Sequence, residues 1–185
     1  MSSQSRPRPV RTEVVGAPVT GTWRIDAERS SLQIGVKVGM LAAVTGRFTD
    51  VQGEVEIGEN PADSRIEVVV PTSSLTSGSK HWDGVLMSAG LVDVEENPTI
   101  AFESTGLAES GSGWRLDGVL MTDRGCLTVT FALECISDGH DDRMRFRATG
   151  SLASKDAVRL LSRPGVDRLI GRQMTVDLTV EAVRS

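Results

Sequence analysis

The chain has 185 residues, which suits one domain large enough to bury a hydrophobic core. Its net charge is −5, and its seven aromatic residues, three tryptophans and four phenylalanines, are scattered along the sequence. A nucleic-acid-binding protein would show a basic stripe with stacking aromatics, so the composition argues against that class. No apolar run approaches the length that crosses a bilayer, so we expect no membrane span.

Residues 1–20 differ in composition from the rest of the chain. They contain Arg6, Arg8 and Arg11 together with three prolines, and they lack the apolar run of a secretory signal peptide. We therefore predict a flexible N-terminal tail over residues 1–20, a single domain over residues 21–185 and a cytoplasmic location.

Apolar and polar residues alternate through most of the domain, which is the pattern of half-buried β-strands. Residues 22–26 and 31–38 predict two strands joined by a polar turn, and the alternation continues to Pro71. It then stops after Thr76. Four apolar residues next recur at three- and four-residue spacing, as on one face of a helix: Trp82, Val85, Leu86 and Ala89.

Both ends of this interruption carry helix-boundary signals. Ser79 is a suitable N-cap, and Gly90 can take the left-handed conformation that ends a helix. The sequence therefore predicts one short helix inserted around residues 79–90.

Alternation returns at Thr99 and continues almost to the end of the chain. Residues 99–107 and 113–121 predict a hairpin closed by a turn at Ser110–Gly113. Further strands are expected up to Ala182, and residues 155–170 look irregular, with at most a helical turn, because Pro164-Gly165 interrupts them.

The expected eight or nine short strands each have one apolar and one polar face. Such a sheet must close into a barrel or pack as a sandwich. The long consecutive strands near the C-terminus favour a meander, so we predict an all-β fold, a single antiparallel barrel of about eight strands. Few aromatics and many small residues favour a hollow interior, whereas in a sandwich the same residues would pack together and leave no cavity.

The two cysteines do not predict a disulfide. Cys126 and Cys135 lie nine residues apart in one predicted strand, which separates them by roughly 30 Å and points them to opposite faces. Both are expected to be free thiols.

Three local patterns suggest chemistry, and each has a simpler explanation. His81 and Asp83 could act as acid and base, but residues two apart on a helix do not face each other. Ser77 and Lys80 match the S-x-x-K pattern of acyl-transfer enzymes, but the accompanying S-D-N and K-T-G motifs do not occur. The acidic cluster at residues 138–142 lacks calcium-loop spacing and fits a solvated hairpin tip.

A row of arginines follows that turn. Arg143, Arg145 and Arg147 alternate with apolar residues. They could meet an anionic head group, but the apolar residues on the opposite face favour the wet exterior of a barrel.

The chain resembles the YceI-like family in a series of short motifs, whose order and spacing over residues 21–183 carry the likeness. They are Gly21-Thr22-Trp23-Arg24-Ile25-Asp26 with Ser30, Val44-Thr45-Gly46-Arg47-Phe48, Gly53, Leu75-Thr76, Asn97-Pro98-Thr99-Ile100-Ala101-Phe102, Gly118-Val119-Leu120 and the final strand Gly171–Ala182.

This resemblance implies a lipocalin-like antiparallel barrel whose interior binds a long isoprenoid chain, such as a polyprenyl or quinone tail. Many family members are secreted to the periplasm. The family usually has Arg-Asp and then His-Leu at the start of the helix, and the matching positions here are Trp82-Asp83 and Val85-Leu86. A histidine often found near the position of Val38 is also absent.

We therefore predict non-enzymatic binding of an isoprenoid-like or other long apolar, fatty molecule inside the barrel, for transport, storage or sensing. No cofactor or metal is expected, and a homodimer is compatible with the sequence. Two alternatives remain: an enzyme of unknown type that uses the barrel-mouth segment around His81, and an interaction module with a packed barrel. The expected ligand-binding residues share the apolar faces of the strands and the helix: Ile34, Val36, Ile66, Val68, Trp82, Leu86, Phe102, Leu116, Leu120, Val129, Phe131, Phe146, Val176 and Leu178.

Overall fold

The structure of the protein is a computed structural model, which describes residues 14–15, 18–38, 42–80, 83–84, 90–137, 142–168 and 170–185. Twelve strands occur in these ranges: β1 (Val14–Val15), β2 (Gly21–Ile25), β3 (Ser31–Val38), β4 (Ala42–Phe48), β5 (Gln52–Ile57), β6 (Arg65–Pro71), β7 (Leu75–Thr76), β8 (Thr99–Ser110), β9 (Gly113–Thr122), β10 (Gly125–Ser137), β11 (Arg143–Ala153) and β12 (Ile170–Arg184). Short 3-10 turns lie between some of them: η1 (Ala27–Arg29), η2 (Pro61–Asp63), η3 (Thr72–Ser74) and η4 (Val166–Arg168).

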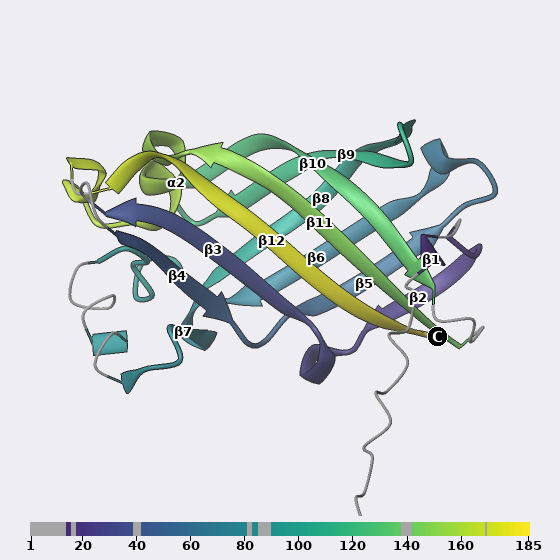
Figure 1. Ribbon diagram of the computed structural model, residues 1–185, viewed down its shortest axis with the longest axis horizontal. Helices are drawn as coiled ribbons and strands as arrows, with labels where there is room; N and C mark the ends of the chain where they lie inside the picture. The colour runs from purple at the N-terminus through teal and green to yellow at the C-terminus, as the bar shows by residue number, and fades with distance from the viewer. Residues whose placement is uncertain are drawn as a thin grey trace, which may run out of the picture.

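The strands form a closed antiparallel barrel (Figure 1). β2 and β3 follow one another in the chain, joined by η1, and together form one bent strand. β4 and β5 also follow one another and form a second bent strand, in which β4 pairs with β3 and β5 pairs with β2. β6 and β7 form a third bent strand, and β8 to β11 complete the meander. β12 closes the ring, because it pairs with β11 on one side and with β2 and β3 on the other.

This arrangement confirms the predicted all-β, lipocalin-like barrel of eight strands. The predicted hairpin after β8 is also present, with Ser110 opposite Gly113. Val14 and Val15 of β1, inside the segment predicted as a tail, pair with Ser137 and Ile136 of β10.

The interruption after β7 starts as a helix. Lys80, Asp83 and Gly84 are helical, and the Asp83 amide donates to the Ser79 carbonyl at 2.8 Å, which is a first-turn helical bond. Gly90 has φ +68°, the left-handed conformation predicted for it. Residues 81–82 and 85–89 lie outside the described part of the chain.

A second helix, α2 (Ser154–Leu161), occupies part of the segment predicted to be irregular. Its buried face consists of Ala157, Val158, Leu160 and Leu161, while Lys155 and Arg159 remain exposed. Two turns of helix are too short to show a clear period in the sequence, and packing against the barrel end stabilises them. α2 lies at one end of the barrel, and the C-terminus lies at the other (Figure 1).

The barrel end opposite α2 is filled by an aromatic side chain. Trp23 of β2 is fully buried, and its indole N–H donates to the Val19 carbonyl at 3.0 Å. The Arg184 guanidinium lies 5.2 Å from the centroid of the tryptophan ring, a cation–π contact. This end of the core is therefore packed.

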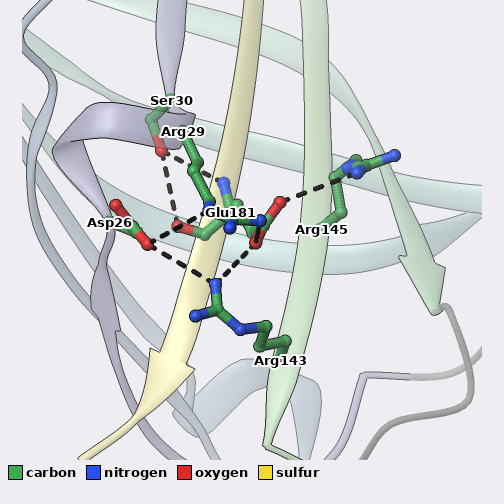
Figure 2. A network of polar contacts seen from close by, with 6 residues as sticks. All are labelled: Asp26, Arg29, Ser30, Arg143, Arg145 and Glu181. Carbon is green, nitrogen blue, oxygen red and sulfur yellow. Dashed lines mark hydrogen bonds and ion pairs between the residues drawn. The ribbon is translucent and has the colours of Figure 1, made fainter.

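The corner between β2 and β3 is held to β12 by a polar network (Figure 2). The Ser30 hydroxyl donates to the Glu181 carbonyl at 3.4 Å and accepts from the Glu181 amide at 3.1 Å, so it replaces backbone pairing where the strand bends. The Glu181 carboxylate in turn pairs with Arg143 at 2.7 Å and Arg29 at 3.3 Å. Because Ser30 and Glu181 are buried, these contacts fix the corner.

We predict that Ser30→Ala destabilises the protein by about 1–3 kcal/mol, because the buried Glu181 amide loses its hydroxyl acceptor. Urea unfolding followed by circular dichroism measures the change. Ser151→Ala, at an exposed position of β11, is the matched control and should change stability by less than about 0.5 kcal/mol. Equal midpoints for the two variants would show that Ser30 does not hold the corner.

Candidate functional site

The barrel encloses a long cavity with an apolar wall. The centre of a water molecule can occupy a volume of about 100 Å³ inside the cavity. The total empty space between the lining atoms is about 1040 Å³, and part of this space is open to solvent. On β11 the lining runs from Phe146 to Leu152, which corresponds to about 20 Å along the strand. The cavity is therefore elongated and follows the barrel axis.

Every side chain that lines this cavity is apolar. The lining comprises Ile25, Leu32, Ile34, Phe48, Val55, Ile66, Val68, Val70, Ile100, Ala101, Phe102, Leu116, Leu120, Phe131, Leu133, Phe146, Ala148, Leu152, Leu161, Met174, Val176, Leu178 and Val180. A ligand with a hydrogen-bonding group at mid-cavity would leave that group without a partner, which costs several kcal/mol. The geometry therefore suits a hydrocarbon chain.

Phenylalanine rings and glycines shape the cavity together. All four phenylalanines of the chain line it, and Phe102 and Phe131 meet edge to face at 5.9 Å. A Cβ at Gly118 would lie 2.4 Å from the Phe102 ring, and a Cβ at Gly150 would lie 2.6 Å from the Phe131 ring. The two glycines thus make room for the rings, which limits how far the rings protrude into the barrel.

Ten of the fourteen residues predicted from the sequence line this one cavity: Ile34, Ile66, Val68, Phe102, Leu116, Leu120, Phe131, Phe146, Val176 and Leu178. Val36 and Val129 are buried in the core without lining it. Trp82 and Leu86 lie outside the described residues. Ligand binding by all fourteen stays a prediction.

Several lining residues were missed by the sequence analysis. Leu32, Val70 and Leu133 occupy the same alternating faces as predicted residues, so the period-two pattern could have identified them. Leu161 belongs to α2 and reaches the cavity from the barrel end, so no strand pattern could have found it.

A buried carboxylate lies beside the end of the cavity near α2. The Asp93 side chain is only 7% exposed, and it pairs with the Arg124 guanidinium at 2.7 Å and with Nε of Arg163 at 3.7 Å. Arg124 also donates to the Ser162 carbonyl. The four residues Asp93, Arg124, Ser162 and Arg163 form what we call the cap network.

Backbone hydrogen bonds join the same segments. The Asp93 amide donates to the Leu161 carbonyl at 2.7 Å, and the Arg163 amide donates to the Gly90 carbonyl at 2.9 Å. A Cβ at Gly90 would lie 2.8 Å from the Arg163 side chain, so glycine is needed there for space as well as for its positive φ. The cap network therefore ties the connection before β8, the end of α2 and the β9–β10 turn together over the barrel end.

A second cluster anchors the start of the segment that follows β7. One Asp83 carboxylate oxygen accepts from the Ser77 amide at 2.5 Å and from the Ser77 hydroxyl at 2.6 Å, and the other accepts from Thr76 at 3.0 Å. The hydrogen bond from the Ser77 amide lowers the pKa of Asp83 most, and the hydrogen bond from the Ser77 hydroxyl lowers it further. These contacts therefore stabilise the folded protein most at a pH above the ordinary pKa of an aspartate. This stabilisation is lost as the pH falls through the lowered pKa of Asp83.

These contacts bear on the chemical patterns in the sequence. Asp83 of the acid–base pattern and Ser77 of the S-x-x-K pattern bind each other, so these two side chains anchor the backbone at the start of this segment. His81 lies outside the described residues, as do residues 138–141 of the acidic cluster.

The arginine row lies on the outer face of the barrel. Arg143 pairs with Glu181, and Arg147 forms a two-pronged pair with Asp177 at 2.6 and 3.1 Å. A polar hollow beside the row is lined by Ser31, Gln33, Ile136, Arg145, Arg147, Asp177 and Thr179. These arginines therefore stabilise contacts between neighbouring strands.

The two cysteines occupy opposite faces of β10. Cys126 is exposed and Cys135 is buried, and both are free. Burial raises the pKa of the Cys135 thiol to about 11, so this thiol is protonated and unreactive at neutral pH.

Within the ranges that the structure describes, no three His, Cys, Asp or Glu side chains are placed to hold a metal ion. No helix in those ranges has the length and apolar character needed to cross a bilayer.

We predict that Asp93→Asn destabilises the protein by about 1–3 kcal/mol, because Arg124 and Arg163 lose their buried carboxylate partner. Hydrogen exchange should speed up at the Asp93 and Arg163 amides, which bridge the cap, before it does so in β10. Asp123→Asn, an exposed neighbour without a described ion pair, is the control. If both variants exchange alike at these amides, the carboxylate does not hold the cap.

Comparisons with known proteins agree with this architecture. Residues 23–182 match the model of the YceI-like domain. The UPF0312 protein of Pseudomonas aeruginosa (strain LESB58) is 28% identical over 148 residues, covering 76% of this chain and 78% of the relative. The UPF0312 protein of Yersinia pestis (strain Pestoides F) is 27% identical over 148 residues, covering 76% and 77%.

Solved structures with low sequence identity share the fold. BcnA of Burkholderia cenocepacia has a TM-score of 0.73 at 17% identity, with coverage of 86% of this chain and 99% of that one. A polyisoprenoid binding domain from Saccharophagus degradans has a TM-score of 0.61 at 12% identity, with coverage of 88% and 98%. Because the family model spans nearly the whole barrel, the chain belongs to the YceI-like family.

Proposed function

We propose that the protein binds a long apolar molecule, isoprenoid-like or fatty, inside the barrel. The observation that carries this proposal is the cavity, whose wall is apolar throughout. The similar domain from Saccharophagus degradans is described as polyisoprenoid binding, which supports the same class of ligand.

The energetics favour a chain over a compact ligand. Each buried methylene contributes about 0.8 kcal/mol, so affinity grows with the length of chain that the cavity accepts. The lining offers no nucleophile, acid or base, so the proposed role is binding without chemical conversion. A polar head group would lie at an end of the cavity, where water or polar side chains can satisfy it.

The cap end is the proposed entrance. Trp23 fills the opposite end, whereas the end near α2 is closed by separate segments joined through side chains. Such a closure can open without breaking the barrel's strand pairing.

A variant that fills the cavity tests the proposal. Ala148 of β11 lines the cavity, and Ala148→Phe should lower the affinity for a fluorescent farnesol analogue at least tenfold, because the new ring occupies the space of the chain. Ala132→Phe is the matched control, since Ala132 is exposed on the neighbouring strand β10. Fluorescence titration gives both affinities, and circular dichroism establishes that each variant is folded.

If Ala148→Phe does not fold, Val176→Met offers a milder filling of the same cavity. Tight binding of the analogue by folded, cavity-filled protein would place the ligand elsewhere. Failure of the wild type to bind any apolar chain would refute the proposed function itself.

A further inference from the structure

The capped end of the barrel carries a segment whose charge is opposite to that of the whole protein. Five exposed cations lie on α2 and between α2 and the first residues of β12: Lys155, Arg159, Arg163, Arg168 and Arg172. Residues 154–172 contain these five cations and two aspartates, a net charge of +3 in a chain with a net charge of −5. We call the five residues the cationic strip.

The strip differs in its ion pairing from the row of arginines on the barrel wall. Arg143 and Arg147 on the barrel wall each form an ion pair with a carboxylate of the neighbouring strand. In the strip, Arg163 belongs to the cap network, and the other four residues form no ion pair with any described carboxylate. Their charge is therefore available to an external anion.

The position of the strip relates it to the cavity. α2 buries its apolar face on the barrel end, and Leu161 at its C-terminal end lines the cavity. Lys155, Arg159 and Arg163 follow one another at four-residue spacing, with Lys155 and Arg159 on the exposed side of α2. Figure 1 shows α2 and the chain after it at the barrel end away from the C-terminus. The cations thus border the proposed entrance.

We infer that the cationic strip docks the capped end of the barrel onto a bilayer surface that contains anionic phospholipids. This inference rests on the proposed function, because a molecule buried in the cavity would leave or enter at that surface. Each lysine or arginine near such a surface adds to the attraction, which falls off within a Debye length. Binding is therefore weak, reversible and sensitive to salt.

Acidic residues at the same end limit the attraction. Glu95, Glu96 and Asp123 are exposed there, and Asp156 lies beside Lys155 on α2. The positive charge at the capped end is therefore confined to the cationic strip and does not cover the whole end. This distribution favours docking in one orientation. Binding to neutral bilayers is not expected, because the strip offers charge and little exposed apolar surface.

Arg163 links docking to the cap. Its Nε lies 3.7 Å from the Asp93 carboxylate, and its side chain is 54% exposed. A lipid phosphate can compete with Asp93 for this guanidinium, since both are oxygen anions that arginine binds. Docking thus weakens one of the contacts that close the cavity.

Co-sedimentation with lipid vesicles tests the inference on ligand-free protein. The wild type should bind vesicles of phosphatidylcholine with phosphatidylglycerol, fail to bind pure phosphatidylcholine, and dissociate at high salt. Arg159→Gln/Arg168→Gln should weaken binding at least tenfold, as expected for two lost surface charges. Arg24→Gln/Arg47→Gln removes two exposed arginines that also lack a described ion pair and should bind like the wild type.

Lys155→Gln/Arg172→Gln repeats the test if the first strip variant does not fold. Equal weakening by the strip and control variants would show that only net charge matters and would overturn the inference. So would equal binding to neutral vesicles, or binding of the strip to a DNA duplex but to no vesicle. Because the assay needs no bound chain, vesicle binding by a protein that takes up no apolar chain would refute the proposed function and leave docking intact.

Discussion

Closure of the sheet by β12 creates the single interior that the other strands share. β12 pairs with β11 along nearly its whole length and with β2 and β3 on its other edge. Closure removes the exposed edges of these strands and divides each strand into an inner and an outer face. The apolar face of each strand then turns toward one shared interior, and the bend at η1 needs the Ser30–Glu181 contacts because β12 must follow both halves of the bent strand.

The same closed barrel has two unlike ends. At one end Trp23 is fully buried and fills the core. At the other, the lining of the cavity reaches Leu152 and Leu161, and the cap network lies over it. The separate segments held by the Asp93 ion pairs can be displaced without breaking the strand pairing of the wall. Because of this asymmetry, we propose the capped end as the entrance.

Period-two alternation predicted most of the barrel strands and ten residues that share one cavity, because each strand has one apolar face. Alternation alone allowed a barrel or a sandwich, and the long consecutive strands near the C-terminus favoured the barrel. Residues such as Val36 show the limit, since an inward-facing side chain near a strand end can pack in the core without lining the cavity. The cap network could not be predicted, because Asp93 meets partners 31 and 70 positions later in the chain. α2 was missed because tertiary packing, rather than local periodicity, stabilises so short a helix.

Native mass spectrometry of the purified protein shows whether the barrel holds a long apolar molecule, because it weighs the protein together with whatever it binds. We expect a fraction of the protein to carry an added mass, released on denaturation as an apolar molecule with a long hydrocarbon chain. Wild-type protein should carry it, and folded Ala148→Phe protein should carry little. Protein with no added mass that also fails to take up an isoprenoid chain supplied during purification would contradict the account.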